Sequence, residues 1–141
     1  MLEIVSDKSW ELLEKCPILN EYDIVKARQI VREFAKKEGM GIVDQTRITT
    51  AVSELFRNMF SYASGGEVLI EKGIVEEKPT LIITCIDNGP GIENIELAMT
   101  DGYTSGGGMG YGLPGAKRLV DRFEIFSELN KGTTVRVMKW K

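Results

Sequence analysis

The sequence predicts an α+β protein, a two-layer sandwich with a mixed, mostly antiparallel sheet and helices on one face. Three observations predict this fold class. Apolar residues recur at helical spacing in two long stretches, residues 23–37 and 44–63. Two pairs of β-like runs follow, and a short polar turn joins each pair, as in hairpins. A third helical stretch, residues 113–122, lies between the pairs, so the order is helix, helix, hairpin, helix, hairpin.

Composition and charge indicate an ordinary globular protein. The 141 residues, 43% hydrophobic and 28% charged, suffice for one domain, residues 1–141. The net charge is −3 and no dense run of Lys or Arg occurs, so nucleic acid is a poor candidate partner. No apolar stretch approaches the roughly 20 residues that span a bilayer, and the first residues lack a signal-peptide pattern. We therefore expect a cytoplasmic protein with no membrane partner.

The sequence has no histidine and two cysteines, Cys16 and Cys85. Without histidine, Ser-His-Asp triads, His-ligated metals and a phosphorylated histidine are excluded. Two widely separated cysteines provide neither a disulfide framework nor a zinc site, and Cys85 is expected in the core. Acid–base chemistry must therefore come from carboxylates, Lys or Tyr.

The N-terminal residues 1–21 are expected to form a strand and an extension. Residues 2–5 are predicted as a short edge strand, and residues 7–20 as a short helix and a connection. The first long helix is predicted to start at Asp23, which can serve as its N-cap. It is expected to end at Lys37 before Gly39, and its buried stripe would consist of Ile24, Ala27, Val31, Phe34 and Ala35.

The second helix, residues 44–63, carries three polar side chains at four-residue spacing, which places them on one strip. They are Glu54, Asn58 and Tyr62. Glu and Asn on a helix are most often its solvated side. Here Phe56, Met59 and Phe60 crowd Asn58 from both sides, which makes simple exposure of that amide less favourable.

The strands are expected at residues 67–74 and 80–86, and again at 123–127 and 133–140. A short helix is predicted around residues 93–99. The helix at 113–122 is predicted to carry Pro114 in its first turn, where proline is favoured.

The strand at residues 81–86 ends abruptly at Asp87, followed by Asn88-Gly-Pro-Gly91. A carboxylate at the end of a core strand is costly unless a donor meets it. Glycines permit positive φ and a close approach of the backbone to another group. An ordinary exit from strand to turn is the alternative, and Asp-Asn-Gly favours that as well.

A glycine-rich loop follows, with six glycines in the eleven positions after Asp101. It leads into the helix at residue 113, and a helix N-terminus offers unpaired N–H groups that bind phosphate. A flexible surface loop is the alternative. No G-x-x-x-x-G-K-[ST] motif occurs, and the G-x-G-x-x-G match at residues 110–115 has no strand directly before it.

Four motifs stand in a fixed order along residues 22–141: Glu54 and Asn58 on a helix, Asp87-x-Gly89-x-Gly91 after a strand, the loop Gly106–Gly112, and Gly132-Thr133 before the last strand. This arrangement resembles the GHKL (Bergerat-fold) ATP-binding superfamily, with its N box, D-x-G-x-G box, glycine lid and final G-T. Residues 53–63, 110–119 and 138–140 are similar to the RsbT-type anti-sigma regulatory serine/threonine kinases. Residues 7–20 depart from the pattern, since they are longer than expected before the first helix.

The resemblance implies roles for the matching positions. Asp87 would accept a hydrogen bond from the adenine amine, and Gly89 and Gly91 would let the base approach the backbone. Asn58 would bind Mg²⁺, which prefers oxygen ligands, and Glu54 would accept the proton of the attacking hydroxyl. Gly106, Gly108, Gly110 and Gly112 would wrap the triphosphate, and Thr133 would line the pocket floor. Further cofactor-binding positions would be Thr104, Gly107, Tyr111 and Leu113. Lys117 and Arg118 either stabilise the transferring phosphate or are exposed helix charges.

The function that the resemblance implies is an ATP- and Mg-dependent protein serine/threonine kinase that switches partners. Its substrate would be a STAS-domain antagonist or scaffold, and it would also activate a PP2C-type phosphatase. Two alternatives stay open. One is an anti-sigma factor kinase that binds a sigma factor directly. The other is an ATP-gated binding module without phosphoryl transfer.

Overall fold

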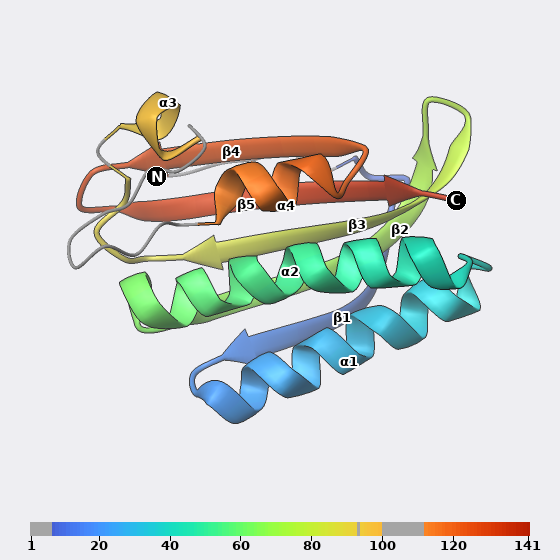
Figure 1. Ribbon diagram of the computed structural model, residues 1–141, viewed down its shortest axis with the longest axis horizontal. Helices are drawn as coiled ribbons and strands as arrows, with labels where there is room; N and C mark the ends of the chain where they lie inside the picture. Colours follow the sequence, from blue (N-terminus) through green and yellow to red (C-terminus); the bar gives the residue numbers. More distant parts are fainter. Residues whose placement is uncertain (1–6, 93, 100–111) are drawn as a thin grey trace.

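The computed structural model describes residues 7–92, 94–99 and 112–141, and these form a helical layer on one face of a five-stranded sheet (Figure 1). The strand order is β1-β2-β3-β5-β4, and every described pairing is antiparallel. The predicted α+β class is confirmed. The elements are β1 (Glu11–Ile18), α1 (Glu21–Lys37), α2 (Ile42–Ala63), β2 (Gly66–Val75), β3 (Lys78–Asp87), α3 (Ile95–Ala98), α4 (Leu113–Arg118), β4 (Arg122–Glu128) and β5 (Gly132–Trp140).

The two long helices are antiparallel neighbours that cover the β1 to β3 side of the sheet (Figure 1). Helix α1 begins one turn earlier than predicted, and Asn20 rather than Asp23 is its N-cap. The Asn20 side chain accepts a hydrogen bond from the Asp23 backbone N–H at 2.9 Å. The Asp23 carboxylate in turn accepts one from the Leu19 backbone N–H. This reciprocal capping explains why Asp23 looked like a start signal.

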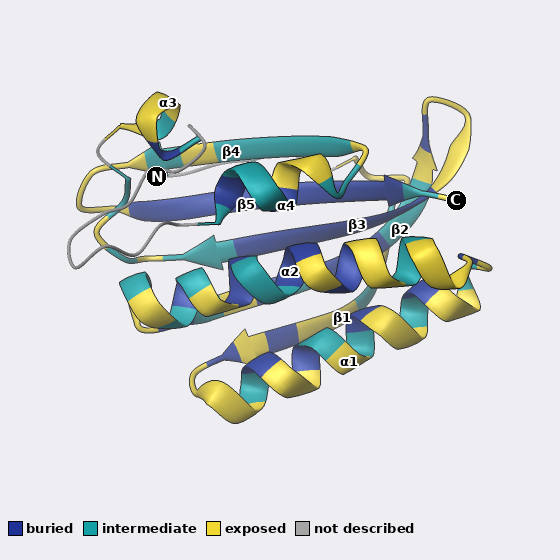
Figure 2. Cartoon of the chain, in the orientation of Figure 1, coloured by how far each residue is buried: buried dark blue, intermediate teal, exposed yellow. Residues whose placement is uncertain are grey.

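The main core lies between the helices and the sheet. Figure 2 shows that strands β3 and β5 are buried along most of their length. Helix α2 packs on both of these strands, and α1 packs on α2 and β1. Alternate residues of β3 point toward the helices, and Leu81, Ile83 and Cys85 belong to this core. Burial raises the pKa of the Cys85 thiol, so Cys85 is core as predicted. The large core fixes the position of α2 over the end of β3.

The prediction of a helix in residues 7–20 is wrong, because residues 11–18 form strand β1 at the sheet edge. Cys16 and Ile18 point into the core at strand spacing, while Glu, Leu and Lys are helix-forming residues that hid this alternation. Trp10, just before the strand, packs on the opposite face of the sheet over Gly73. The edge strand predicted at residues 2–5 lies outside the described residues.

Helix α4 is shorter than predicted and ends at Arg118. Asp121 makes three hydrogen bonds to strand β5, each at 2.9 Å, instead of continuing the helix. Its N–H donates to the Met138 carbonyl, and its carboxylate accepts from the Lys139 ammonium and the Trp140 N–H. Pro114 does lie in the first turn, as expected. The short helix predicted near residues 93–99 is α3, with Asn94 as its cap.

Both predicted hairpins are present. In the first, Glu76 and Glu77 have φ values of 49° and 67°, the left-handed conformations of a two-residue turn between twisted strands. In the second, β4 and β5 pair from Arg122 with Met138 to Glu128 with Gly132. The second hairpin brings Thr133 opposite Asp87 on β3. Among the described residues, no helix is long and apolar enough to cross a membrane.

Candidate functional site

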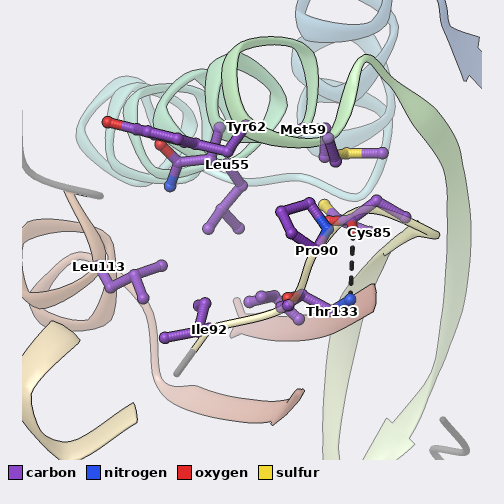
Figure 3. Close-up of a pocket in the computed structure, with 13 residues that line it drawn as sticks. Leu55, Met59, Tyr62, Cys85, Pro90, Ile92, Leu113 and Thr133 are labelled. Atoms are coloured by element: carbon purple, nitrogen blue, oxygen red, sulfur yellow. Dashed lines mark hydrogen bonds between the residues drawn. The ribbon is translucent and has the colours of Figure 1, made fainter. Parts of the chain in front are cut away.

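A pocket opens where helix α2 passes over the ends of β3 and β5, close to the start of α4 (Figure 3). Leu55, Met59 and Tyr62 reach it from α2, Leu113 from α4, and Pro90 and Ile92 from the turn after β3. The walls are mostly apolar, with a few polar groups among them. The lining residues are Leu55, Asn58, Met59, Tyr62, Ala63, Cys85, Asp87, Pro90, Gly91, Ile92, Leu113, Thr133 and Val135.

Asp87 is the carboxylate of this pocket. Its Oδ1 accepts hydrogen bonds from the backbone N–H groups of Gly89 at 3.0 Å and Thr133 at 3.1 Å. Its other oxygen, Oδ2, accepts none from the described part of the chain. Burial raises the pKa of Asp87, and the two backbone donors offset this only in part. The carboxyl group is therefore held rigidly through one oxygen while the other is available to a ligand that donates.

The turn after β3 lies too close to other chain segments for a side chain at two of its glycines. A Cβ at Gly89 would come within 2.4 Å of the Ala63 Cβ, at the end of α2. Gly91 has φ of +79°, and its Cβ would lie 2.4 Å from the Glu128 carbonyl oxygen. The glycines of the D-x-G-x-G motif thus let this turn fit between α2 and the β4–β5 hairpin, which sets the pocket wall.

Ser127 of β4 connects the turn after β3 to the start of β5, and the sequence analysis did not identify it as a site residue. Its hydroxyl oxygen accepts a hydrogen bond from the Ile92 N–H at 2.7 Å and lies 2.9 Å from the Thr133 hydroxyl. It also lies 3.2 Å from the Gly132 carbonyl oxygen, to which it can donate. Thirty-five residues separate Ser127 from Ile92. No local motif signals such a contact, so only the strand register of β4 could have indicated it.

The three polar residues predicted on one strip of α2 do not all line the pocket. Asn58 and Tyr62 line the pocket. Glu54, one turn before Asn58, is not among the lining residues but lies against Gly112, where a Cβ would come within 2.6 Å of its Oε2. Its Oε1 is 3.4 Å from the Arg57 guanidinium. The structure thus brings Glu54 to the end of the glycine-rich loop, and Asn58 to the pocket beside it.

Of the glycine-rich loop, the structure describes only the end. Gly112 is the N-cap of α4 with φ of +70°, and Leu113 is buried in the pocket wall. The other predicted positions lie outside the described residues: Thr104, Gly106, Gly107, Gly108, Gly110 and Tyr111. Lys117 and Arg118 are exposed in the last turn of α4.

The donor set suits a nucleotide better than a metal held by the protein alone. In the described ranges no three His, Cys, Asp or Glu side chains come together as a metal site. A single amide such as Asn58 suits a magnesium ion that takes most of its ligands from phosphate and water. An apolar slot lined by a carboxylate suits a flat base that carries an amino group. The residues present therefore fit ATP, with Mg²⁺ carried on its phosphates.

The fold and the pocket together define a nucleotide-binding domain of the two-layer α+β class. Comparison with known proteins gives the family: residues 43–141 match the model of the histidine kinase-, DNA gyrase B- and HSP90-like ATPases. The chain belongs to this family.

Two relatives match the chain over most of its length. The chain is 49% identical over 123 residues to the serine/threonine-protein kinase RsbT of Bacillus subtilis (strain 168), covering 87% of this chain and 92% of that protein. It is 37% identical over 124 residues to an anti-sigma F factor of Clostridium perfringens (strain SM101 / Type A), covering 82% and 85%.

Among solved structures, the chain is similar to the RsbU and RsbW domains of Rv1364c from Mycobacterium tuberculosis. The TM-score is 0.60 at 18% identity, and the match covers 90% of this chain and 32% of that one. At this identity the similarity shows the fold alone, and it agrees with the antiparallel sheet and one-sided helical layer described above.

Proposed function

We propose that this protein is an ATP- and Mg²⁺-dependent protein serine/threonine kinase and a partner-switching regulator. The observation that carries the proposal is the carboxylate of Asp87, which lines an apolar pocket and is held by backbone donors through Oδ1 alone. A second carboxylate, Glu54, lies one helical turn from the pocket residue Asn58 and against Gly112. The 49% identity to a protein named as a serine/threonine kinase supports the proposal.

In this proposal Asp87 Oδ2 accepts a hydrogen bond from the exocyclic amine of adenine, which a guanine cannot offer at that position. Leu55, Met59 and Cys85 pack against the purine ring, and Thr133 lines the floor. The predicted loop positions, Gly106 to Gly112, surround the triphosphate. Asn58 would hold Mg²⁺ through its amide oxygen, and the ion would supply neutralisation of the phosphate charge.

Phosphoryl transfer needs a base near the acceptor hydroxyl. A Ser or Thr oxygen of the substrate protein forms a bond to the γ-phosphorus while the bond from that phosphorus to the β–γ bridging oxygen breaks, and ADP leaves. The hydroxyl proton passes to the Glu54 carboxylate. Glu54 suits this role because it lies against Gly112, where the phosphate-binding loop meets α4.

For the partners, we propose a STAS-domain antagonist or scaffold as substrate and a PP2C-type phosphatase as the protein activated after release, in the cytoplasm. The similarity to the kinase named RsbT supports this choice, because the two sequences are 49% identical and the match covers most of both chains. The similarity to an anti-sigma F factor favours a second candidate, a kinase that binds a sigma factor directly. The third candidate is an ATP-gated binding module without transfer.

The test is to incubate the purified protein with γ-labelled ATP, Mg²⁺ and, in separate reactions, STAS-domain proteins and sigma factors encoded in the same genome. Label on a Ser or Thr of a STAS-domain protein is the expected result. Stable, ATP-dependent binding of a sigma factor would favour the second candidate. ATP binding without transfer to any protein would contradict the kinase proposal and leave the binding module.

A further inference from the structure

A second hollow, of about 310 Å³, lies between helices α1 and α2, apart from the nucleotide pocket. Two arginines of α1, Arg28 and Arg32, form one wall. Hydroxyl side chains of α2 form the other. The lining residues are Arg28, Gln29, Arg32, Thr49, Thr50 and Ser53, and we call this hollow the arginine groove.

The positions of the two arginines are electrostatically unfavourable for helix α1. They stand four residues apart near the middle of α1, where like charges on one face destabilise a helix. The helix dipole favours cations only in the last turn, where Lys36 and Lys37 already lie. Such a local conflict without a gain inside the fold is typical of a functional surface.

Neither arginine has a compensating partner in the described residues. Other cations of the structure do: Arg122 pairs with Glu76 at 2.9 Å, and Lys139 with Asp121 at 2.9 Å and Asp44 at 3.3 Å. In the described ranges no carboxylate comes within ion-pair distance of Arg28 or Arg32. Their guanidinium N–H groups are therefore available to a ligand.

Two of the three hydroxyls opposite are already engaged within α2. The Thr49 hydroxyl donates to the Gln45 carbonyl at 2.6 Å, and the Ser53 hydroxyl donates to the Thr49 carbonyl at 2.7 Å. The hydrogens of these two hydroxyls are thus used within α2, and the two charged guanidinium groups are the strongest donors of the groove. A guanidinium fork matches the two oxygens of a carboxylate, so the groove suits Asp and Glu side chains.

The position of the groove connects it to the phosphoryl-transfer site. Thr50, on the groove wall, stands four residues before Glu54, so the two lie on one strip of α2. Arg57, which contacts Glu54, lies one turn beyond Ser53 and is also exposed. A polypeptide bound in the groove therefore lies beside the carboxylate that would accept its hydroxyl proton.

We infer that the arginine groove is the docking site for an acidic segment of the substrate protein, near its acceptor Ser or Thr; this inference rests on the proposed kinase function. The chain as a whole carries a net charge of −3 and would repel an acidic partner. A local pair of unpaired arginines turns that repulsion into attraction at one place. The groove thus selects the substrate, while the nucleotide pocket selects ATP.

The test compares two double variants with the same change in net charge. Arg28→Glu with Arg32→Glu reverses the groove. Lys26→Glu with Lys37→Glu is the control, because both residues are exposed on α1 and line a different hollow. Phosphorylation of the STAS-domain substrate is measured as KM and kcat at low and at physiological ionic strength, and ADP affinity is measured by calorimetry to show that both variants are folded.

The groove variant is expected to raise KM for the protein substrate by about tenfold or more with kcat and ADP affinity unchanged. The groove variant should also lose the salt dependence of KM. The control variant should keep the wild-type KM and its salt dependence. Equal KM values for wild type and groove variant, or an equal rise in the control, would overturn the inference.

If the wild type phosphorylates no STAS-domain protein, the proposed function fails separately, and a second measurement decides the docking site. A fluorescein-labelled peptide of Asp, Glu and Ser is titrated with each protein and followed by anisotropy. Wild type and control should bind it and the groove variant should not. Failure of the wild type to bind, or equal binding by the groove variant, would count against the groove.

Discussion

The carboxylate of Asp87, at the end of β3, accepts a hydrogen bond at 3.1 Å from the backbone N–H of Thr133, at the start of β5. The two residues are 46 positions apart and face each other in the β3–β5 register. A second bond to the same oxygen comes from Gly89. The pocket acceptor is thereby fixed by backbone alone, and its direction depends on the register of two strands rather than on another side chain.

The first prediction concerns Asp87→Asn. The Asn carbonyl can keep both backbone hydrogen bonds, while its amide would present a donor where Oδ2 now presents an acceptor. Loss of a charged hydrogen bond should weaken ADP binding by about 1.5–3 kcal/mol, measured by calorimetry. Discrimination between ADP and GDP should fall as well, because an amide donor suits the guanine carbonyl. An unchanged ADP dissociation constant would remove Asp87 from base recognition.

A second prediction is the pH dependence that follows from the same group. Burial raises the pKa of Asp87 above its ordinary value of 3.8, so the folded protein holds this proton more tightly than the unfolded chain does. As pH rises from 3.8 through the raised pKa, ionisation of Asp87 lowers the stability of the ligand-free protein, and above that window the loss is constant.

Asp87→Asn should therefore be at least as stable as the wild type at neutral pH without nucleotide, despite its weaker ADP binding. Thermal melts across pH with and without ADP measure both effects. In the wild type alone, ADP affinity should decline as pH falls through the raised pKa, because a protonated carboxyl is the weaker acceptor. A less stable ligand-free variant at neutral pH would contradict the burial argument.

The third prediction tests Ser127 as a positioning residue. Ser127→Ala removes the acceptor of the Ile92 N–H and the contact with the Thr133 hydroxyl. Leaving the partners unsatisfied should cost about 1–2 kcal/mol of stability, seen as a drop in Tm. ADP binding should weaken too, because both sides of the pocket wall move. Thr46→Ala is the matched control: among the described residues its hydroxyl donates to the Ile42 carbonyl within α2 and to no pocket residue, so its removal should leave ADP binding unchanged.

The sequence predicts those parts of the site that local patterns determine. Asp87 stands at a strand end followed by glycines, and Asn58 lies on a strongly periodic helix; both line the pocket. The contacts of Ser127 with Ile92, and of Asp87 with Thr133, could not be predicted, because they depend on pairing between distant strands. Strand β1 was missed for another reason: as an edge strand it buries few residues, and its helix-forming composition outweighed the alternation.

The fourth prediction concerns Gly112→Ala. The residue has φ of +70°, which costs about 1–2 kcal/mol for a residue with a Cβ. The new methyl group would also lie 2.6 Å from Glu54 Oε2, and the flexible end of Glu54 would have to move away. Phosphoryl transfer to the substrate protein should therefore fall more than ADP affinity does. Gly115→Ala is the control, because a Cβ there meets no atom within 4 Å. Equal loss in both variants would mean that helix α4, rather than Glu54, is disturbed.

The last prediction separates binding from chemistry at Glu54. Glu54→Ala removes the proposed base, but Asp87 and Asn58 stay in place on β3 and α2, so ATP·Mg binding should be retained. Loss of one general base lowers phosphoryl transfer by about 10²–10⁴-fold. Single-turnover transfer to the substrate and calorimetry with a non-hydrolysable ATP analogue measure the two quantities. Arg57→Ala is the companion variant, since it removes the cation 3.4 Å from the Glu54 carboxylate without removing the base, and should lower transfer much less. Retained phosphorylation in Glu54→Ala would assign the proton to another acceptor.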